Sequence, residues 1–191
     1  MNILTDPLPS TIKIGDKEIP VKTDFRIWIR FISIMQEYDL DHLTVEDYVD
    51  MMDRVSKLLF SRPPELSNEL FLAIVTFFSG FSNEKKGDTN GKKTYDYNID
   101  ADAIYSSFAQ IYGIRLAGQQ MHWYEFRALF ANLPEECPIG KLIHIRTMKD
   151  SEVPKEKRTE FRKLKESVAL PAFRSYAEDD NALNNLRKAL R

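Results

Sequence analysis

The stretch MHWYEFRALFANLPE, residues 121–135, gathers four aromatic rings and an arginine within eight positions. Rings beside a cation suit base stacking or peptide docking when they are exposed, and they suit a core helix when they are buried. Helical spacing collects the apolar side chains here into one stripe, formed by Trp123, Phe126, Phe130 and Leu133, with Tyr124, Ala128 and Ala131 beside it. An exposed patch of that size would cause aggregation without a partner. We therefore predict a core helix that ends before Pro134.

Two side chains of this helix remain candidates for partner binding. Tyr124 and Arg127 lie near the edge of the apolar stripe. A side chain at such an edge can reach solvent while its neighbours are buried. We expect any partner contact of this helix to involve these two residues.

The N-terminal region predicts a hairpin and then a buried helix. TIKIGDKEIP, residues 11–20, begins with alternating apolar residues and turns at Gly15-Asp16, which is typical of a hairpin. Pro20 has no N–H, so its strand should lie at a sheet edge. Thr23-Asp24 offers an N-cap to residues 25–38, where the polar residues form one narrow stripe. A helix with so little polar surface should be largely buried.

Two more helices are expected before residue 82. Thr44 and Asp47 resemble a capping box for a helix that stops before Pro63-Pro64, with Val45, Tyr48, Met52, Val55 and Leu59 on its apolar face. Residues 66–81 are rich in apolar side chains and are interrupted at Gly80. The stretch is too short and too interrupted to span a membrane.

The rest of the chain predicts a loop and several helices. Residues 82–94 contain two glycines and no apolar residue, so we expect an exposed, mobile loop. A helix should follow Asp100 and end at Gly113, with Ile99, Ala103, Tyr105, Phe108, Ile111 and Tyr112 at helical spacing. Residues 138–148 can form a short helix, and another after Pro154 would turn Phe161, Leu164 and Val168 inward.

These elements predict a mainly α fold, a helical domain of about six to eight helices with a short N-terminal β-hairpin. Residues 1–175 would form this single domain, and residues 176–191 a C-terminal tail helix. The opening residues have no cationic segment followed by an apolar run, and we expect neither secretion nor membrane spanning.

Motifs for catalysis or metal binding are not convincing. Cys137 is the single cysteine, which excludes an intrachain disulfide and favours a buried thiol. The three histidines lie in different segments without a second ligand at helical spacing. DLDHLTVED, residues 39–47, begins like a calcium loop but has Leu43 and Thr44 where an oxygen ligand and a glycine are needed. We expect no enzyme, no metal and no cofactor.

Charge is balanced overall and uneven locally. The chain has 27 basic and 29 acidic residues. Residues 31–53 contain seven acidic residues and no Lys or Arg, whereas residues 141–174 contain ten basic and five acidic ones. Both regions could be solvated helix faces, or they could pair within the fold or between copies. The candidate contacts between copies are Asp47 and Asp50 with Arg158 and Arg162.

Nucleic-acid binding is a minor alternative. KEKRTEFRKLK, residues 155–165, is basic but is interrupted by Glu156 and Glu160. Its two apolar residues are needed inward, so few rings remain for base stacking. Phosphate contacts alone would give weak, salt-sensitive binding without sequence preference.

Several segments, in order, resemble the bacteriophage gene-product-fifteen family over about residues 8–171. They are TIKIGDKEIPVKTDFRIWIRF, YDYNIDADAIYSSFAQIYGI, MHWYEFRALFANLPE and KEKRTEFRKLK. The D-A-D-x-I-Y-x-S-F segment followed by H-W-x-x-F-R-A-L-F is the specific combination. Tyr124 stands where the family often has a second tryptophan.

The resemblance implies a tail assembly chaperone of long, non-contractile-tailed phages and prophages of Gram-positive bacteria. Such a protein coats the tape measure protein, keeps it soluble and helps recruit tail tube protein subunits. The resemblance also implies work in the host cell cytoplasm and absence from the mature virion, and the role fits a homo-oligomer. It supplies no catalytic residue. The alternatives are a structural tail or head–tail joining component that stays in the virion, and a nucleic-acid-binding phage protein.

Overall fold

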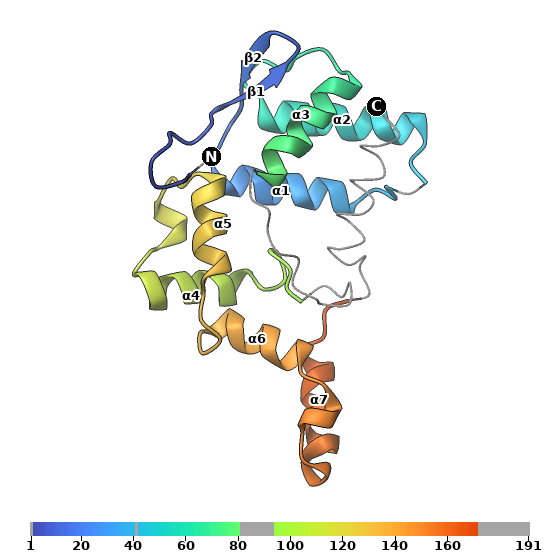
Figure 1. The fold of residues 1–191 in the computed structure, drawn as a ribbon. Coiled ribbons are helices and arrows are strands. Elements are labelled where there is room, and N and C mark those ends of the chain that lie inside the picture. The colour runs from blue at the N-terminus through green and yellow to red at the C-terminus, as the bar shows by residue number, and fades with distance from the viewer. Residues whose placement is uncertain (1, 41, 81–93, 172–191) are drawn as a thin grey trace. The chain divides into compact units, whose positions relative to one another are not determined.

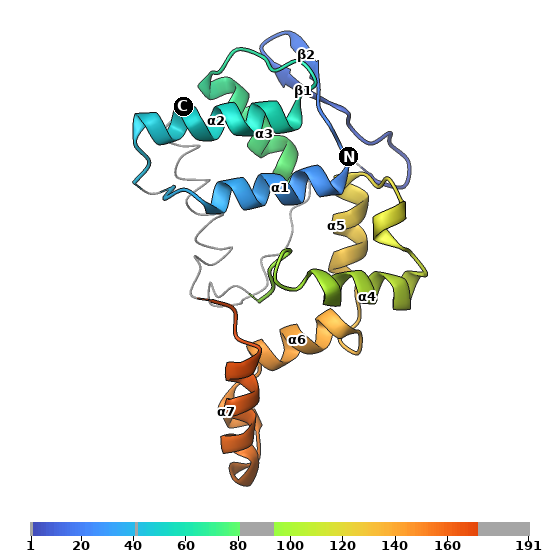
Figure 2. The same ribbon diagram turned by 180° about the vertical axis from the view of Figure 1, so that it is seen from behind.

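The computed structural model describes residues 2–40, 42–80 and 94–171, and this part of the chain is mainly helical (Figures 1 and 2). It contains seven α-helices, three short 3-10 helices and one two-stranded hairpin. Contacts divide it into two compact units, residues 2–80 with 120–128 and residues 94–119 with 129–171. The predicted mainly α fold with an N-terminal hairpin is confirmed. The single domain over residues 1–175 stays a prediction.

The first unit begins with the predicted hairpin. Strands β1 (Thr11–Ile14) and β2 (Lys17–Pro20) are antiparallel, with Ile12 opposite Ile19. Gly15 between them has a φ of 55°, a left-handed conformation that glycine adopts without strain. The turn glycine therefore sets the register that places Ile12 in the core, where it is 4% exposed.

Three helices follow, each started by the type of side chain that caps a helix. They are α1 (Phe25–Gln36), α2 (Val45–Leu59) and α3 (Asn68–Ser79). Asp24 accepts from the Arg26 N–H, Thr44 and Asp47 form the predicted capping box, and Ser67 accepts from the Leu70 N–H. Helix α1 packs on α2, and α3 packs against β1.

Helix α5 (Trp123–Ala131) completes the core of the first unit, and the unit boundary falls within it, after residue 128. Trp123 and Phe126 are 1% and 0% exposed. The rings of Phe25 and Phe126 stack at 4.6 Å, and those of Phe78 and Trp123 at 5.4 Å. The prediction of a core helix is thus confirmed for its first two turns.

The second unit contains α4 (Ala101–Tyr112), α6 (Pro138–Thr147) and α7 (Arg158–Ser167), with short helices η1 (Leu116–Gly118), η2 (Asp150–Glu152) and η3 (Lys155–Lys157). Gly113 ends α4 with a φ of 67°, as predicted. Helix α4 packs on α6, and α6 packs on α7. Cys137 is free and buried.

Several side chains predicted to face inward are exposed. Val45 is 76% exposed because it begins α2, beyond the reach of the helices that cover Met52 and Val55. On α4 the buried positions are Ile104, Ser107 and Phe108, so Tyr105 and Ile111 face out, and Ile99, just before the helix, is also exposed. Helix α7 has no buried residue among its ten, and Leu164 is 46% exposed. The predicted loop 82–94, apart from Thr94, and the tail helix 176–191 lie outside the described residues.

Candidate functional site

The first turn of α5 covers the C-terminal end of α3. The last carbonyls of a helix have no partner within that helix. Trp123 donates from Nε1 to the Phe78 carbonyl at 3.0 Å, and the Tyr124 hydroxyl donates to the Phe77 carbonyl at 2.5 Å. Arg127 donates from Nη1 to the carbonyls of Phe78 and Ser79 at 3.0 and 2.8 Å. Side chains of the stretch 121–135 therefore close α3, and the arginine charge lies where the helix dipole is negative.

Through these hydrogen bonds, Tyr124 and Arg127 have a structural role within the first unit. Tyr124 is 6% exposed, and burial raises the pKa of its hydroxyl to about 12. The Arg127 guanidinium lies 5.7 Å from the centre of the Trp123 ring. Binding of a partner by these residues stays a prediction, and the buried Tyr124 has little surface left to offer.

His122, one residue earlier, is held as a neutral ring. Its Nε2 lies 2.9 Å from the Pro9 carbonyl, which can only accept a hydrogen bond, so Nε2 carries the proton. Its Nδ1 accepts from the Tyr124 N–H at 3.1 Å. Burial, opposed by the bond to Pro9, lowers the pKa of His122 below its ordinary value. Protonation of Nδ1 would break the bond from Tyr124.

Helix α2 presents a mixed acidic and apolar surface. Its outer face, defined by Val45, Glu46, Val49 and Asp50, is exposed, and the two valines are 76% and 50% exposed. Asp50 accepts a hydrogen bond from the Tyr38 hydroxyl, and the Tyr38 hydroxyl accepts from Arg54 at 2.8 Å. These contacts hold the Asp50 side chain in place without covering the valines.

Asp47, a candidate contact between copies, is also part of the predicted capping box of α2. Its N–H donates to the Thr44 hydroxyl at 3.1 Å, and its Oδ2 accepts from the Thr44 N–H at 3.4 Å. Both bonds belong to the capping box of α2. A substitution at Asp47 would therefore change helix stability as well as surface charge.

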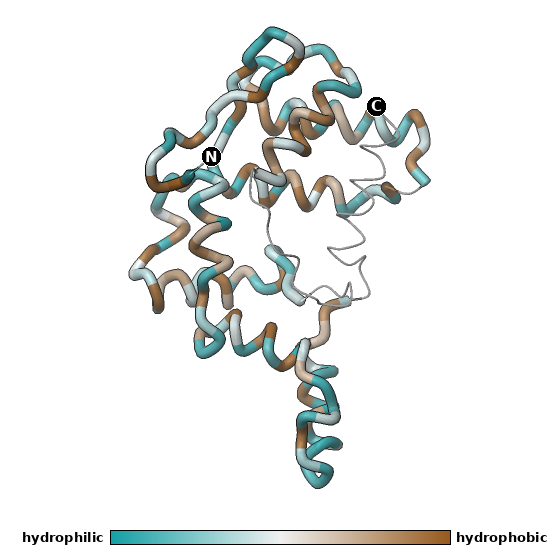
Figure 3. Tube along the Cα trace, in the orientation of Figure 1, coloured by the Kyte–Doolittle hydropathy of each residue, from teal (hydrophilic) through white to brown (hydrophobic). Residues whose placement is uncertain are grey.

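Helix α7 of the second unit is basic and largely solvated. Arg158 donates from Nε to the Val153 carbonyl at 3.0 Å, and Arg162 pairs with Asp150 at 2.6 Å. Lys165 reaches the Met148 carbonyl at 2.7 Å. In Figure 3 this part of the chain is mostly teal, whereas α3 is mostly brown. Arg158 is half-buried, and Arg162 is exposed but paired with Asp150, so contact of these two residues with a partner stays a prediction.

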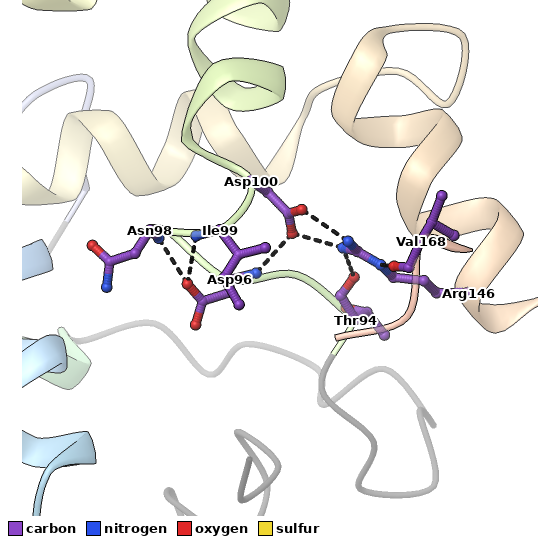
Figure 4. Close-up of polar contacts among 7 residues, drawn as sticks. All are labelled: Thr94, Asp96, Asn98, Ile99, Asp100, Arg146 and Val168. Carbon is purple, nitrogen blue, oxygen red and sulfur yellow. Dashed lines mark hydrogen bonds and ion pairs between the residues drawn. The ribbon is translucent and has the colours of Figure 1, made fainter. Parts of the chain in front are cut away.

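One polar cluster of the second unit was not predicted from the sequence (Figure 4). Arg146 binds Asp100 through two nitrogens at 2.6 and 2.8 Å, with 9% and 3% of the two side chains exposed. It also donates to the carbonyls of Thr94 at 3.0 Å and Val168 at 2.7 Å. Four donated bonds join three segments that are far apart in the sequence. Residue type and spacing gave no signal for this, since a basic residue in a basic region is usually solvated.

A second unpredicted contact starts α6. The Ser107 hydroxyl of α4 accepts from the Ile139 N–H at 3.0 Å and donates to the Ala103 carbonyl at 2.7 Å. Ser107 and Ile139 are both buried. A side chain from another helix thus satisfies an N–H in the first turn of α6.

The part of the chain that the structure describes has neither a cluster of metal ligands nor a membrane-spanning helix. Within residues 2–40, 42–80 and 94–171, no group of three His, Cys, Asp or Glu side chains could hold a metal ion. No helix in the same residues has the length and apolar character needed to cross a membrane.

Comparison with known proteins identifies a family. The sequence profile described as "Bacteriophage Gp15 protein" matches residues 4–170, nearly the whole chain. No curated protein and no solved structure matches the chain.

Proposed function

Because the chain belongs to the Bacteriophage Gp15 protein family, we propose that it is a tail assembly chaperone for the phage tape measure protein. It binds this long protein in the host cell cytoplasm, keeps it soluble and helps to recruit tail tube subunits. It leaves the particle before the virion is complete. Family membership shows that the chain is a phage protein. The proposed role as a chaperone rests on the resemblance in sequence together with the exposed surface of α2.

The outer face of α2 is the observation that supports binding of a helical partner. Val45 and Val49 are one helical turn apart, and both are exposed between acidic residues. A partner helix can cover such a pair with its own apolar stripe, while basic side chains beside that stripe meet Glu46 and Asp50. The charge pattern therefore favours an amphipathic helix with a basic margin.

Co-expression with the tape measure protein tests this function. The wild-type chain should keep the tape measure protein soluble and co-purify with it. Val45→Glu with Val49→Glu should abolish both effects, because the apolar pair becomes charged. Ile99→Glu is the matched control, since Ile99 is also 50% exposed but lies in the other unit. Equal solubility with the double variant, or co-purification lost in the control alone, contradicts the proposal.

Mass spectrometry of purified virions separates the chaperone from a structural component. A chaperone should be absent from the particle while the tail tube and tape measure proteins are present. Copies of this chain at a fixed ratio to those proteins would favour a tail or head–tail joining component.

We also propose that, before the tape measure protein binds, copies of the chain associate through the outer face of α2 and α7 of a neighbour, so that the two partners use this face in turn. The exposed acidic residues of one copy would meet Arg158 and Arg162 of the next, a head-to-tail contact that can form rings or spirals. Glu46→Lys with Asp50→Lys should shift the mass in light scattering at low salt toward the monomer. This pair avoids Asp47, which caps α2, and Glu65→Lys with Glu125→Lys, at two exposed acidic residues outside this face, serves as a charge-matched control. An unchanged mass distribution would rule out this contact.

A further inference from the structure

The free edge of β1 offers main-chain hydrogen-bonding groups. The Val21 N–H donates to the Ser10 carbonyl at 2.9 Å, which makes this pair a hydrogen-bonded one. Hydrogen-bonded pairs alternate in an antiparallel ladder, so Ile12 and Ile14 bond to β2, and Thr11 and Lys13 turn their N–H and C=O groups outward. Within residues 2–40, 42–80 and 94–171, no residue bonds to these outward groups.

A groove of about 510 Å³ runs along this edge. Five consecutive residues of the hairpin, 11–15, form one wall, and no residue of β2 contributes. The other wall is one face of α3, and the lining there comprises Glu69, Leu72, Ala73 and Thr76, with Phe77 and Tyr124 beside it. A hollow on the face of the sheet would be lined by alternate residues of both strands. This groove instead lies between the edge of β1 and a helix, all within the first unit.

The outer edge of β2 is closed by its sequence. The positions opposite Thr11 and Lys13 are Pro20 and Glu18. Proline has no N–H to donate, so a strand added at this edge would lack one of its main-chain hydrogen bonds. The two edges of one hairpin are therefore unequal, and the edge that can accept a strand is the one beside the groove.

We propose that this groove binds an extended, uncharged segment of a partner protein, which adds to β1 as a third strand. The segment exchanges hydrogen bonds with Thr11 and Lys13 and turns alternate apolar side chains toward Leu72 and Ala73. The outward groups are two residues apart on a strand, which suits an extended chain and not a helix. Lys13 and Glu69 are of opposite charge, so the lining carries no net charge for a charged segment to match. This inference does not depend on the chaperone role.

Selection from a displayed library of random twelve-residue peptides, with the full chain as bait, tests the inference. Enriched peptides should carry apolar residues at alternate positions. Titration calorimetry should give binding about tenfold weaker for Lys13→Pro, since two main-chain bonds of modest strength are lost or distorted. Glu18→Pro is the matched control and should bind as the wild type does, because it changes only the edge of β2.

If Lys13→Pro is unstable, two further measurements still test whether a peptide binds in this groove. Ala73→Arg places a long side chain in the groove and leaves the sequence of β1 unchanged. This variant should also lose binding. Bound peptide should slow amide hydrogen exchange at Thr11 and Lys13 in the wild type. The inference is overturned if no peptide is enriched, if Lys13→Pro binds normally, if the bound peptides are helical, or if β1 pairs with β1 of a second copy.

Discussion

The two units are held together in different ways. The first unit is built on stacked aromatic rings, with Trp28, Phe31 and Trp123 almost wholly buried. The second unit buries fewer rings and includes three polar side chains among its buried residues, Asp96, Asp100 and Ser107. Apolar packing tolerates small errors of position, whereas a buried charge needs a partner at one place. The second unit should therefore be more sensitive to loss of single polar contacts.

The largest effect is expected for Trp123→Ala in the first unit. The ring is 1% exposed, stacks on Phe78, and its Nε1 bonds to the Phe78 carbonyl. Removing a buried tryptophan costs about 3 to 5 kcal/mol of the free energy of unfolding. Chemical denaturation measures this loss. An unchanged stability with loss of partner binding would instead make the ring a docking platform.

Arg146→Met should cost the second unit about 3 kcal/mol, because the Asp100 carboxylate is left buried without its partner. Adding Asp100→Asn removes that charge while keeping the shape of the side chain. The double variant should therefore be more stable than Arg146→Met alone, by denaturation under the same conditions. A double variant that is no more stable would mean that the charge pair is not what fixes this cluster.

Gly140→Ala should destabilise the second unit by about 1 to 3 kcal/mol. A Cβ at Gly140 would lie 2.4 Å from the Pro134 carbonyl oxygen and 2.6 Å from that of Glu135, so backbone must move. Gly118→Ala is the control, since its Cβ would meet nothing within 4 Å. Comparison of the two melting temperatures checks this prediction, and equal values would contradict it.

The smallest effect is expected from His122 and depends on pH. Its folded-state pKa lies below the ordinary value of 6.5, so the unfolded chain binds a proton first as the pH falls. The stability that its neutral ring contributes is complete above pH 6.5 and is lost as the pH falls toward the folded-state pKa. Stability of His122→Gln should fall less than that of the wild type over this range. Parallel pH profiles of the two proteins would contradict the assignment.

Local signals predicted most of the elements. Gly15 and Gly113 allow the left-handed backbone of a turn and a helix end, and the Thr44–Asp47 pair caps the start of a helix. The structure has this turn and these helix ends at the residues that the sequence predicted. Apolar spacing likewise predicted a core helix within residues 121–133, and the structure has it at Trp123–Ala131. Spacing could not tell which apolar positions are covered, as Val45 and Leu164 show, because covering depends on neighbours distant in the sequence.

The polar contacts between helices could not be predicted for the same reason. Arg146 and Asp100 are 46 residues apart, and Ser107 and Ile139 are 32 apart. Each of these residues is ordinary in its local sequence. All six candidate partner residues make hydrogen bonds or ion pairs within the fold, and the sequence could not show how much of each side chain these contacts leave for a partner.

The closure of α3 by α5 has a consequence for synthesis on the ribosome. The first unit is discontinuous in sequence, since residues 120–128 complete what residues 2–80 begin. In a nascent chain that ends at residue 80, the last carbonyls of α3 lack the hydrogen bonds that α5 donates. Such a chain also lacks the ring of Trp123, which stacks on Phe78. About 40 further residues, some seconds of translation, must follow before that apolar surface is covered. A protein proposed to shield another chain thus has an interval in which its own aromatic core is unshielded.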